Sequence, residues 1–226
     1  MPTSIIDSLA SWLKPGTVRR IGEVNIWETA SGYRACHTAD LARFGPESGA
    51  DVLPTHTLST DARQLAKLDA ERKFRPLKSA PNLSGDWLLE LPSIEAVREA
   101  LDYFYPAGIA LWLRWANGKI APVHLRQTLN RQTGMYRVTG LIRDEEATAL
   151  VQEACAPENC RRKILWEISE DLPVPLVREK RLETSPAPGV ELPENVPLLC
   201  CEACNILVAA ARAVVKKRMA DEAAAS

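Results

Sequence analysis

The sequence predicts an α+β protein with a small β-rich N-terminal domain, residues 1–90, packed on a mainly helical C-terminal domain, residues 91–226. Residues 18–40 are rich in β-forming side chains and carry a Ser31–Gly32 turn signal. Several segments after residue 91 instead repeat apolar side chains at helical spacing. The composition is that of a folded protein, because 46% of the residues are hydrophobic and 25% are charged.

The N-terminal domain is expected to begin with a short amphipathic helix over residues 5–13, where apolar side chains recur at helical spacing. Strands joined by the Ser31–Gly32 turn follow within residues 18–40. The remaining elements are a Gly- and Pro-containing loop over roughly 45–57, a helix over 59–74 that Ser59 or Thr60 can cap, and a short strand around Trp87–Leu91.

The C-terminal domain opens with a predicted helix over residues 93–106, capped by Ser93 and ended by Pro106. Residues 107–118 are apolar, and their periodicity fits either a helix or a buried strand. The later expected elements are helices over 122–134 and 143–155, a strand over 164–168, an irregular proline-rich connection over 171–197, and a last helix that starts near Cys201–Cys204 and ends before a frayed tail over 220–226.

The charge balance and hydropathy exclude several classes of partner. The net charge is −1, so no overall basic field attracts nucleic acid or anionic membrane. No run of about 18 apolar residues predicts a membrane span, and the N-terminus does not read as a signal peptide. We therefore expect a cytoplasmic protein, in which thiols stay reduced, with neither nucleic acid nor membrane as a partner.

Five of the six cysteines lie in the last third of the chain, in two tight groups. Their spacing is C-x4-C followed, after a long connection, by C-C-x2-C; the residues are Cys155, Cys160, Cys200, Cys201 and Cys204. Clustered thiols in a reducing compartment point to metal binding rather than to disulfides. The sixth, Cys36, lies in a predicted strand far along the chain and is expected to pack in the core.

Two kinds of metal centre use four thiolates. Zinc binds them tetrahedrally, commonly in knuckles with a nearby glycine, and neither cysteine group here is followed by one. A [4Fe–4S] cluster takes one thiolate per iron, which suits irregular spacing. The apolar letters "LL" before and "NILV" after the last group would shield a cluster from water. The cluster is the favoured cofactor, and zinc is the alternative.

The residues alone leave one ligand open. If the last helix begins at the cysteines, Cys204 shares a face with Cys201 at i−3 or with Cys200 at i−4, and the other of that adjacent pair points away. Arg161 and Arg162 directly follow Cys160. These cations would stabilise a negatively charged cluster, or they form a solvated surface patch.

No catalytic constellation is visible. His37, His56 and His124 are scattered and are expected at the surface or in turns. No histidine neighbours a cysteine in the metal-binding half, so an enzyme with a nucleophilic cysteine is not favoured. An electron-transfer or accessory role is expected instead.

Several stretches resemble a known family. "LNRQTGMYRV", "CAPENC", "RRKILWEI" and "LLCCEACNILVAAAR" resemble the [4Fe–4S] cluster-binding domain appended to sirohydrochlorin chelatases of the cobalamin-biosynthesis type. Upstream, "DARQLAKLDAERKFRPLKSAPNLSGDW" and "ALDYFYPAGIALW" resemble the stabilising segment that precedes that domain. The last cysteine pair of the family resembles C-P-x-x-C, with Cys201 here in the place of the proline. The resemblance implies Cys155, Cys160, Cys200 and Cys204 as ligands, with Cys201 as the alternate to Cys200.

The resemblance also implies a role. It suggests an iron–sulfur redox or accessory module linked to sirohydrochlorin and tetrapyrrole metallation, with a chelatase or a redox protein as partner and a tetrapyrrole as a potential ligand. The paired histidines of a chelatase are not seen, so metal insertion is not expected of this chain. Arg131, Arg137, Arg161 and Arg162 are the candidates for contact with the cofactor or with an anionic ligand. The alternative is a zinc-stapled interaction module with no redox role.

Overall fold

The computed structural model divides the chain into two compact units, which we describe separately. It describes residues 4–48, 52–67, 83–121, 123–156, 159–174, 182 and 191–225. The sheet unit comprises Met1–Pro76, Asn82–Lys119 and Ser185–Leu198, and the cysteine unit comprises Leu77–Pro81, Ile120–Thr184 and Leu199–Ser226. The main division therefore falls after Lys119 rather than at the expected residue 90, because the two helices after residue 93 belong to the sheet unit. The expected α+β class is confirmed.

The sheet unit is built on five strands in the order β4-β3-β2-β1-β6. The strands are β1 Val18–Ile21, β2 Val24–Thr29, β3 Gly32–His37, β4 Leu88–Leu91 and β6 Asn195–Val196. The first four pair antiparallel, and the hairpin predicted at Ser31–Gly32 joins β2 to β3. β6 pairs parallel with β1 and comes from the stretch expected to be irregular. Gly22, in the β1–β2 turn, has φ +56°, and a Cβ there would lie 2.7 Å from the Leu198 side chain.

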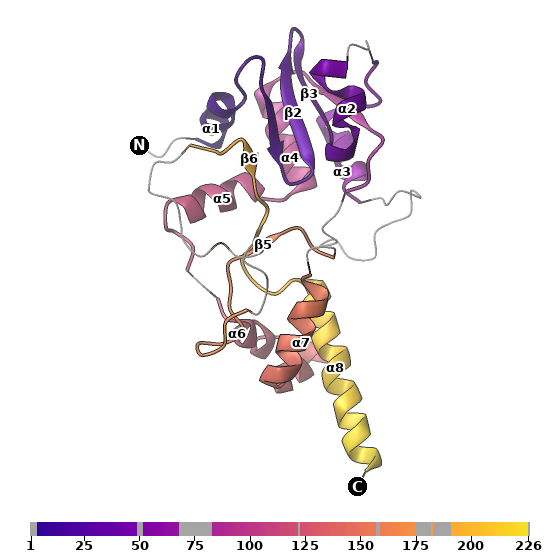
Figure 1. The fold of residues 1–226 in the computed structure, drawn as a ribbon, viewed down its shortest axis with the longest axis vertical. Coiled ribbons are helices and arrows are strands. Elements are labelled where there is room, and N and C mark those ends of the chain that lie inside the picture. Colours follow the sequence, from indigo (N-terminus) through magenta and orange to yellow (C-terminus); the bar gives the residue numbers. More distant parts are fainter. Residues whose placement is uncertain are drawn as a thin grey trace. The chain divides into compact units, whose positions relative to one another are not determined.

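Helices complete the sheet unit. They are α1 Ile5–Trp12, α2 Leu41–Phe44, α3 Ala62–Leu65, α4 Ile94–Phe104 and α5 Gly108–Ala116, with 3-10 turns η1 Thr38–Asp40, η2 Pro46–Ser48 and η3 Ser59–Asp61. Figure 1 shows α4 behind the strands, and Ser93 caps it as predicted by accepting from the Ala96 N–H. The ambiguous segment 107–118 is a helix. Of the helix expected over 59–74, η3 and α3 are present, and its part after residue 67 lies outside the described residues.

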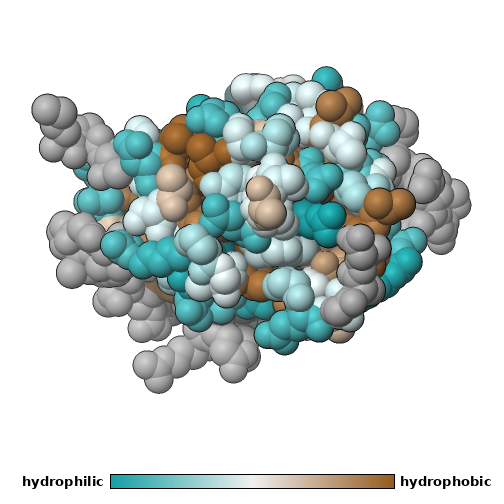
Figure 2. Space-filling view, turned by 90° about the horizontal axis from the view of Figure 1, so that it is seen from above, coloured by the Kyte–Doolittle hydropathy of each residue, from teal (hydrophilic) through white to brown (hydrophobic). Residues whose placement is uncertain are grey.

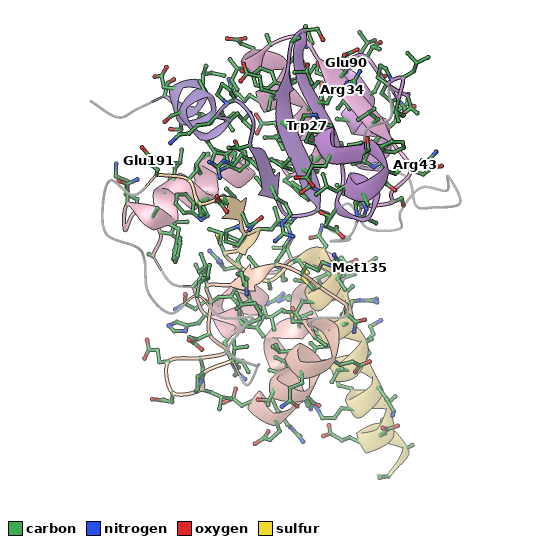
Figure 3. The ribbon with its side chains drawn as sticks, turned by 45° about the horizontal axis from the view of Figure 1, so that its top comes forward. Trp27, Arg34, Arg43, Glu90, Met135 and Glu191 are labelled. Atoms are coloured by element: carbon green, nitrogen blue, oxygen red, sulfur yellow. The ribbon has the colours of Figure 1, made fainter. Side chains whose placement is uncertain are left out.

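An aromatic stack, an apolar cluster and an ion pair hold the sheet unit together. Trp87 stacks on Phe104 of α4 with ring centroids 5.0 Å apart, and Cys36 is fully buried in a cluster with Trp27 and Phe44, as expected. Figure 3 labels Trp27 and the Arg34–Glu90 pair, which joins β3 to β4 at 3.6 Å. These contacts fix the strand register that the alternating pattern required.

The expectation that His37 lies at the surface or in a turn is wrong. β3 continues through His37, which is a buried residue with 9% of its surface exposed. Its Nε2 lies 3.5 Å from the carboxylate of Glu23, which is itself 3% exposed. The His37 Nδ1 accepts from the Ala39 N–H at 3.2 Å and the Glu23 carboxylate accepts from the Leu83 N–H at 2.8 Å, so each buried polar group has a hydrogen bond.

The cysteine unit is mainly helical. Its elements are α6 Leu125–Asn130, η4 Gly134–Leu141, α7 Asp144–Ala154, α8 Asn205–Ala224, β5 Lys163–Ile164 and β7 Leu199–Cys200. α7 and α8 lie side by side (Figure 1) and share one apolar core with the segment around Trp166. The strand expected over 164–168 is reduced to β5. The tail expected to fray stays helical to Ala224, where Glu222 pairs with Arg143 at 2.9 Å and alanine favours helix.

The described surface has an ordinary polarity. On the face drawn in Figure 2, hydrophobic residues occur in small groups among hydrophilic ones. In the part of the chain that the structure describes, no helix is both long and apolar enough to cross a membrane.

Candidate metal centre

A short parallel strand pair brings the two cysteine groups together. β5 and β7 are aligned so that Ile164 lies opposite Cys200, and the Leu165 N–H donates to the Cys200 carbonyl at 3.0 Å. Cys160 lies just before β5, while Cys200 ends β7. The long connection between the groups is therefore closed by backbone hydrogen bonds.

The thiol of Cys200 has a defined environment. The indole Nε1–H of Trp166 donates to its Sγ at 3.3 Å, and the Sγ–H donates to the Glu202 carbonyl at 3.3 Å. Burial of the sulfur raises the pKa of Cys200 to about 11, against the lowering effect of the Trp166 hydrogen bond; the charges of Cys204 and Cys160 raise this pKa further.

The other thiols converge on the same apolar core. Cys155 is the C-cap residue of α7, is 8% exposed and belongs to the core cluster of the unit. Cys200 and Cys204 pack against that cluster. Cys204 is the N-cap residue of α8, and its carbonyl accepts from the Val208 N–H at 3.0 Å. The positive end of the helix dipole favours a thiolate at this position.

The helical argument for the adjacent cysteines is wrong. Because α8 begins at Asn205, neither Cys200 nor Cys201 lies on the helix with Cys204. Cys200 ends a strand and Cys201 follows it, and successive side chains of an extended chain point to opposite sides. Cys200 packs against the core cluster, whereas Cys201 is not among the residues of that cluster or those packed against it.

The donor set fits a cluster of several irons. All six cysteines are thiols, including the four expected ligands. Among the described residues, no three His, Cys, Asp or Glu side chains are grouped tightly enough to hold a single metal ion. A [4Fe–4S] cluster makes a looser demand, because each thiolate binds a different iron. Sulfur donors gathered beside an apolar core are the type of ligand that iron–sulfur clusters use.

The four candidate arginines lie in different surroundings. Arg162 donates to the Leu199 carbonyl at 3.3 Å, and its positive charge lowers the pKa of Cys200 against the larger effect of burial, which raises it. Arg131 pairs at 3.7 Å with Glu202, in the loop between Cys201 and Cys204. Arg161 and Arg137 are exposed, the latter on η4. Two of the four thus contact the segment that carries the last three cysteines.

Sequence reasoning missed Trp166. The sequence predicted only that Trp166 lies in a strand over residues 164–168, yet its indole N–H donates to the Cys200 sulfur. The available signal was a tryptophan a few residues after Cys160, since a buried indole needs an acceptor for its N–H. Its acceptor depends on the β5–β7 register, which sequence spacing does not specify.

Comparisons with known families agree with this architecture. Residues 9–116 match the DR2241 stabilising domain, and residues 117–213 match the 4Fe-4S iron-sulfur cluster binding domain. The two matches are consecutive and together span most of the chain. The resemblance seen in the sequence is confirmed: the chain is similar to a DR2241 stabilising domain followed by a 4Fe-4S iron-sulfur cluster binding domain.

A solved structure shares the fold. It is DR2241 from Deinococcus radiodurans, described as a multi-domain protein with structural similarity to chelatases and two additional novel domains. The similarity has a TM-score of 0.66 at 24% sequence identity and covers 88% of this chain. The chain corresponds to only 39% of the length of that protein. No curated protein matches the chain.

Proposed function

We propose that this chain binds one [4Fe–4S] cluster through Cys155, Cys160, Cys200 and Cys204. The observation that carries the proposal is the β5–β7 pair, which aligns the segment after Cys160 with the strand that ends at Cys200. The match to a 4Fe-4S cluster binding domain over residues 117–213 supports it independently. A cluster bound only by the folded unit would stabilise the closure of the long connection between the two cysteine groups.

Cys200 is the proposed ligand rather than Cys201. Its sulfur accepts a hydrogen bond from Trp166 and feels the charges of Cys160 and Cys204. On binding iron, Cys200 would release the proton that it now donates to the Glu202 carbonyl, and the Trp166 contact needs no change of donor. Cys201 is the control position next to it.

A bound [4Fe–4S] cluster supplies one-electron chemistry, and the chain supplies its surroundings. The apolar core beside Cys155 and Cys204 excludes water from one side. Arg162 offsets negative charge near Cys200, and Arg131 holds Glu202 by an ion pair. The Arg162 charge would favour the more negative, reduced state.

The test is anaerobic reconstitution with iron and sulfide. We expect a brown protein with a broad absorption band, about four irons and four sulfides per chain, and an EPR signal after dithionite reduction. Serine at any of the four ligand positions should abolish the signal. Cys201→Ser and Cys36→Ser should retain it. Loss of the signal in Cys201→Ser with retention in Cys200→Ser would reverse that part of the assignment.

Zinc stapling is the alternative function, because four thiols are also a zinc donor set; it would require the thiols to move closer together than they lie among the described residues. In that case, protein purified without oxygen would be colourless and hold stoichiometric zinc. Iron and sulfide addition would then yield no cluster. The two metals thus give opposite results in one preparation.

We further propose an electron-transfer or accessory role beside tetrapyrrole metallation in the cytoplasm. The support is the solved relative, whose description includes structural similarity to chelatases. Arginines around the cysteine segment could attract the carboxylates of a sirohydrochlorin-type ligand or of its carrier protein. Titrating the loaded protein with sirohydrochlorin should change the visible spectrum of the tetrapyrrole. An unchanged spectrum at micromolar protein would exclude direct ligand binding.

A further inference from the structure

The indole of Trp166 is held firmly against the cysteine loop. The residue is 2% exposed and forms part of the core cluster of the cysteine unit. Its backbone is fixed on both sides: Leu165 N–H donates to the Cys200 carbonyl at 3.0 Å, and Leu125 N–H donates to the Glu167 carbonyl at 2.8 Å. The Nε1–H therefore reaches the Cys200 sulfur from a position that the fold determines.

We propose that Trp166 is a positioning residue that raises the reduction potential of the cluster by donating its N–H to the Cys200 sulfur. This inference rests on the proposed function. An added electron increases the negative charge on the ligand sulfurs, and a hydrogen-bond donor stabilises that charge. Because the donor is buried, little water is available to replace it if it is lost.

The variant Trp166→Phe keeps an aromatic ring and removes the donor. We expect it to bind iron and sulfide as the wild type does. Its reduction should become about tenfold less favourable, which for one electron is about 59 mV toward negative potential. The measurement is a redox titration of the EPR signal. Trp112→Phe, at a 3% exposed tryptophan of the sheet unit, is the matched control and should leave the potential unchanged.

A second variant separates the hydrogen bond from packing. Replacing Trp166 by 3-(3-benzothienyl)alanine puts sulfur in place of the indole N–H at almost the same volume. It should lower the potential as the phenylalanine does. If this near-isosteric variant binds the cluster with the wild-type potential, the inference is overturned, even where Trp166→Phe shows a shift.

A direct readout is also at hand. Of the six tryptophans, only Trp166 belongs to the cysteine unit. With ¹⁵N-labelled indoles, cluster loading should shift or broaden the N–H signal that disappears in Trp166→Phe, and leave the Trp112 signal in place. Loading that leaves the Trp166 signal unmoved overturns the inference.

The two proposals fail in different ways. Wild-type protein that takes up no iron and sulfide would contradict the proposed function. If the wild-type protein binds the cluster, but the Trp166 substitutions leave the potential unchanged and cluster loading leaves the Trp166 signal unmoved, only the role of Trp166 is contradicted.

Discussion

Cys36 and Cys200 are both thiols in apolar surroundings, but they are equipped for different roles. Cys36 lies in the middle of the sheet, fully buried among Trp27, Phe44 and Leu88. Burial, and secondarily the charge of Asp40, raises the pKa of Cys36 to about 12. Cys200 instead receives a hydrogen bond from Trp166 and lies near other thiols. Cys36 is thus placed for packing, whereas Cys200 has the hydrogen-bond donor that a cluster ligand would use.

We predict that Cys36 resists alkylation in the folded protein. At pH 8, iodoacetamide should label half-buried thiols such as Cys201 within minutes and leave Cys36 unlabelled until urea is added, because only the thiolate reacts. Mass spectrometry of the peptides measures this. Labelling of Cys36 in the native state as fast as Cys201 would contradict its assignment to the core.

The same thiol makes stability depend on pH. The pKa of Cys36 in the folded chain is about 12, above the ordinary value of 9.0. Between these two pH values, the folded chain keeps a thiol proton that the unfolded chain has lost. Stabilisation from Cys36 is therefore complete below pH 9.0 and declines as the pH rises toward 12. Urea unfolding of wild type and Cys36→Ala at pH 7 and pH 10 should show the difference between the two proteins shrinking at the higher pH.

At this scale, sequence predicts residue type better than residue contact. Cys36 could be placed in the core because its neighbours are β-formers. The burial of His37 could not be predicted in this way, because it involves a contact with Glu23, which lies between β1 and β2. The spacing of the last cysteines predicts metal binding, whereas the proposed choice of Cys200 over Cys201 depends on where β7 ends and α8 begins.

Among the elements, α8 contributes to the cysteine unit in two ways. Leu207, Val208, Ala211 and Val215 are buried against the core, while Met219 on the outer turns is 45% exposed. The residue at the N-cap of the helix is Cys204, one of the proposed ligands. Loosening its packing should therefore affect both the stability of the unit and the placement of a ligand.

We predict that Leu207→Ala lowers the free energy of unfolding by about 2–5 kcal/mol, the usual cost of removing a fully buried leucine side chain. Leu207 is 1% exposed. Met219→Ala should change stability by less than about 0.5 kcal/mol. Urea unfolding followed by circular dichroism measures both. Equal losses in the two variants would mean that α8 does not pack as described.

Arg218 is the main polar anchor of α8. Its side chain is 19% exposed, and it bonds to Glu146 at 2.9 Å and to the Leu141 carbonyl at 2.8 Å. A lysine has no planar fork to reach both acceptors. Arg218→Lys should therefore cost about 1–2 kcal/mol of unfolding free energy, whereas Lys217→Arg, at an exposed site, should be neutral. A neutral Arg218→Lys would show that charge alone suffices.

Sequence predicted the elements whose signals are local. α4 carries its own cap at Ser93 and an apolar face, so its bounds were nearly right. The two-residue strands β5, β6 and β7 have no such pattern, because each exists only through its partner strand. α5 could not be distinguished from a buried strand, since its tryptophans and leucines suit either structure.

For the whole molecule, the main finding is that the chain returns to its first unit. β6 lies within the region matched to the cluster binding domain, yet it pairs with β1 in the sheet unit. Pro193 also accepts a hydrogen bond from the Trp12 indole at 2.6 Å. The order of the two units along the sequence is thus not a simple succession, which is why a single boundary at residue 90 could not be right.

We predict that the sheet unit depends on β6. Val196 is 2% exposed, so Val196→Asp would bury a carboxylate and destabilise the sheet unit by several kcal/mol. Its neighbour Asn195 is exposed, and Asn195→Asp should change stability by less than about 0.5 kcal/mol. Five of the six tryptophans belong to the sheet unit, so fluorescence-detected unfolding measures the effect. Similar stability of both variants would contradict the pairing of β6 with the folded sheet.

Only Pro197 and Leu198 separate β6 from β7, the strand that ends at Cys200. The Gly22 amide donates to the Val196 carbonyl at 3.1 Å, and a chain restrained at Cys200 has less freedom to pull that carbonyl away. Deuterium uptake at Gly22 should therefore slow when iron occupies the cysteine unit. An amide proton in a β-turn would then report the metal content of the protein.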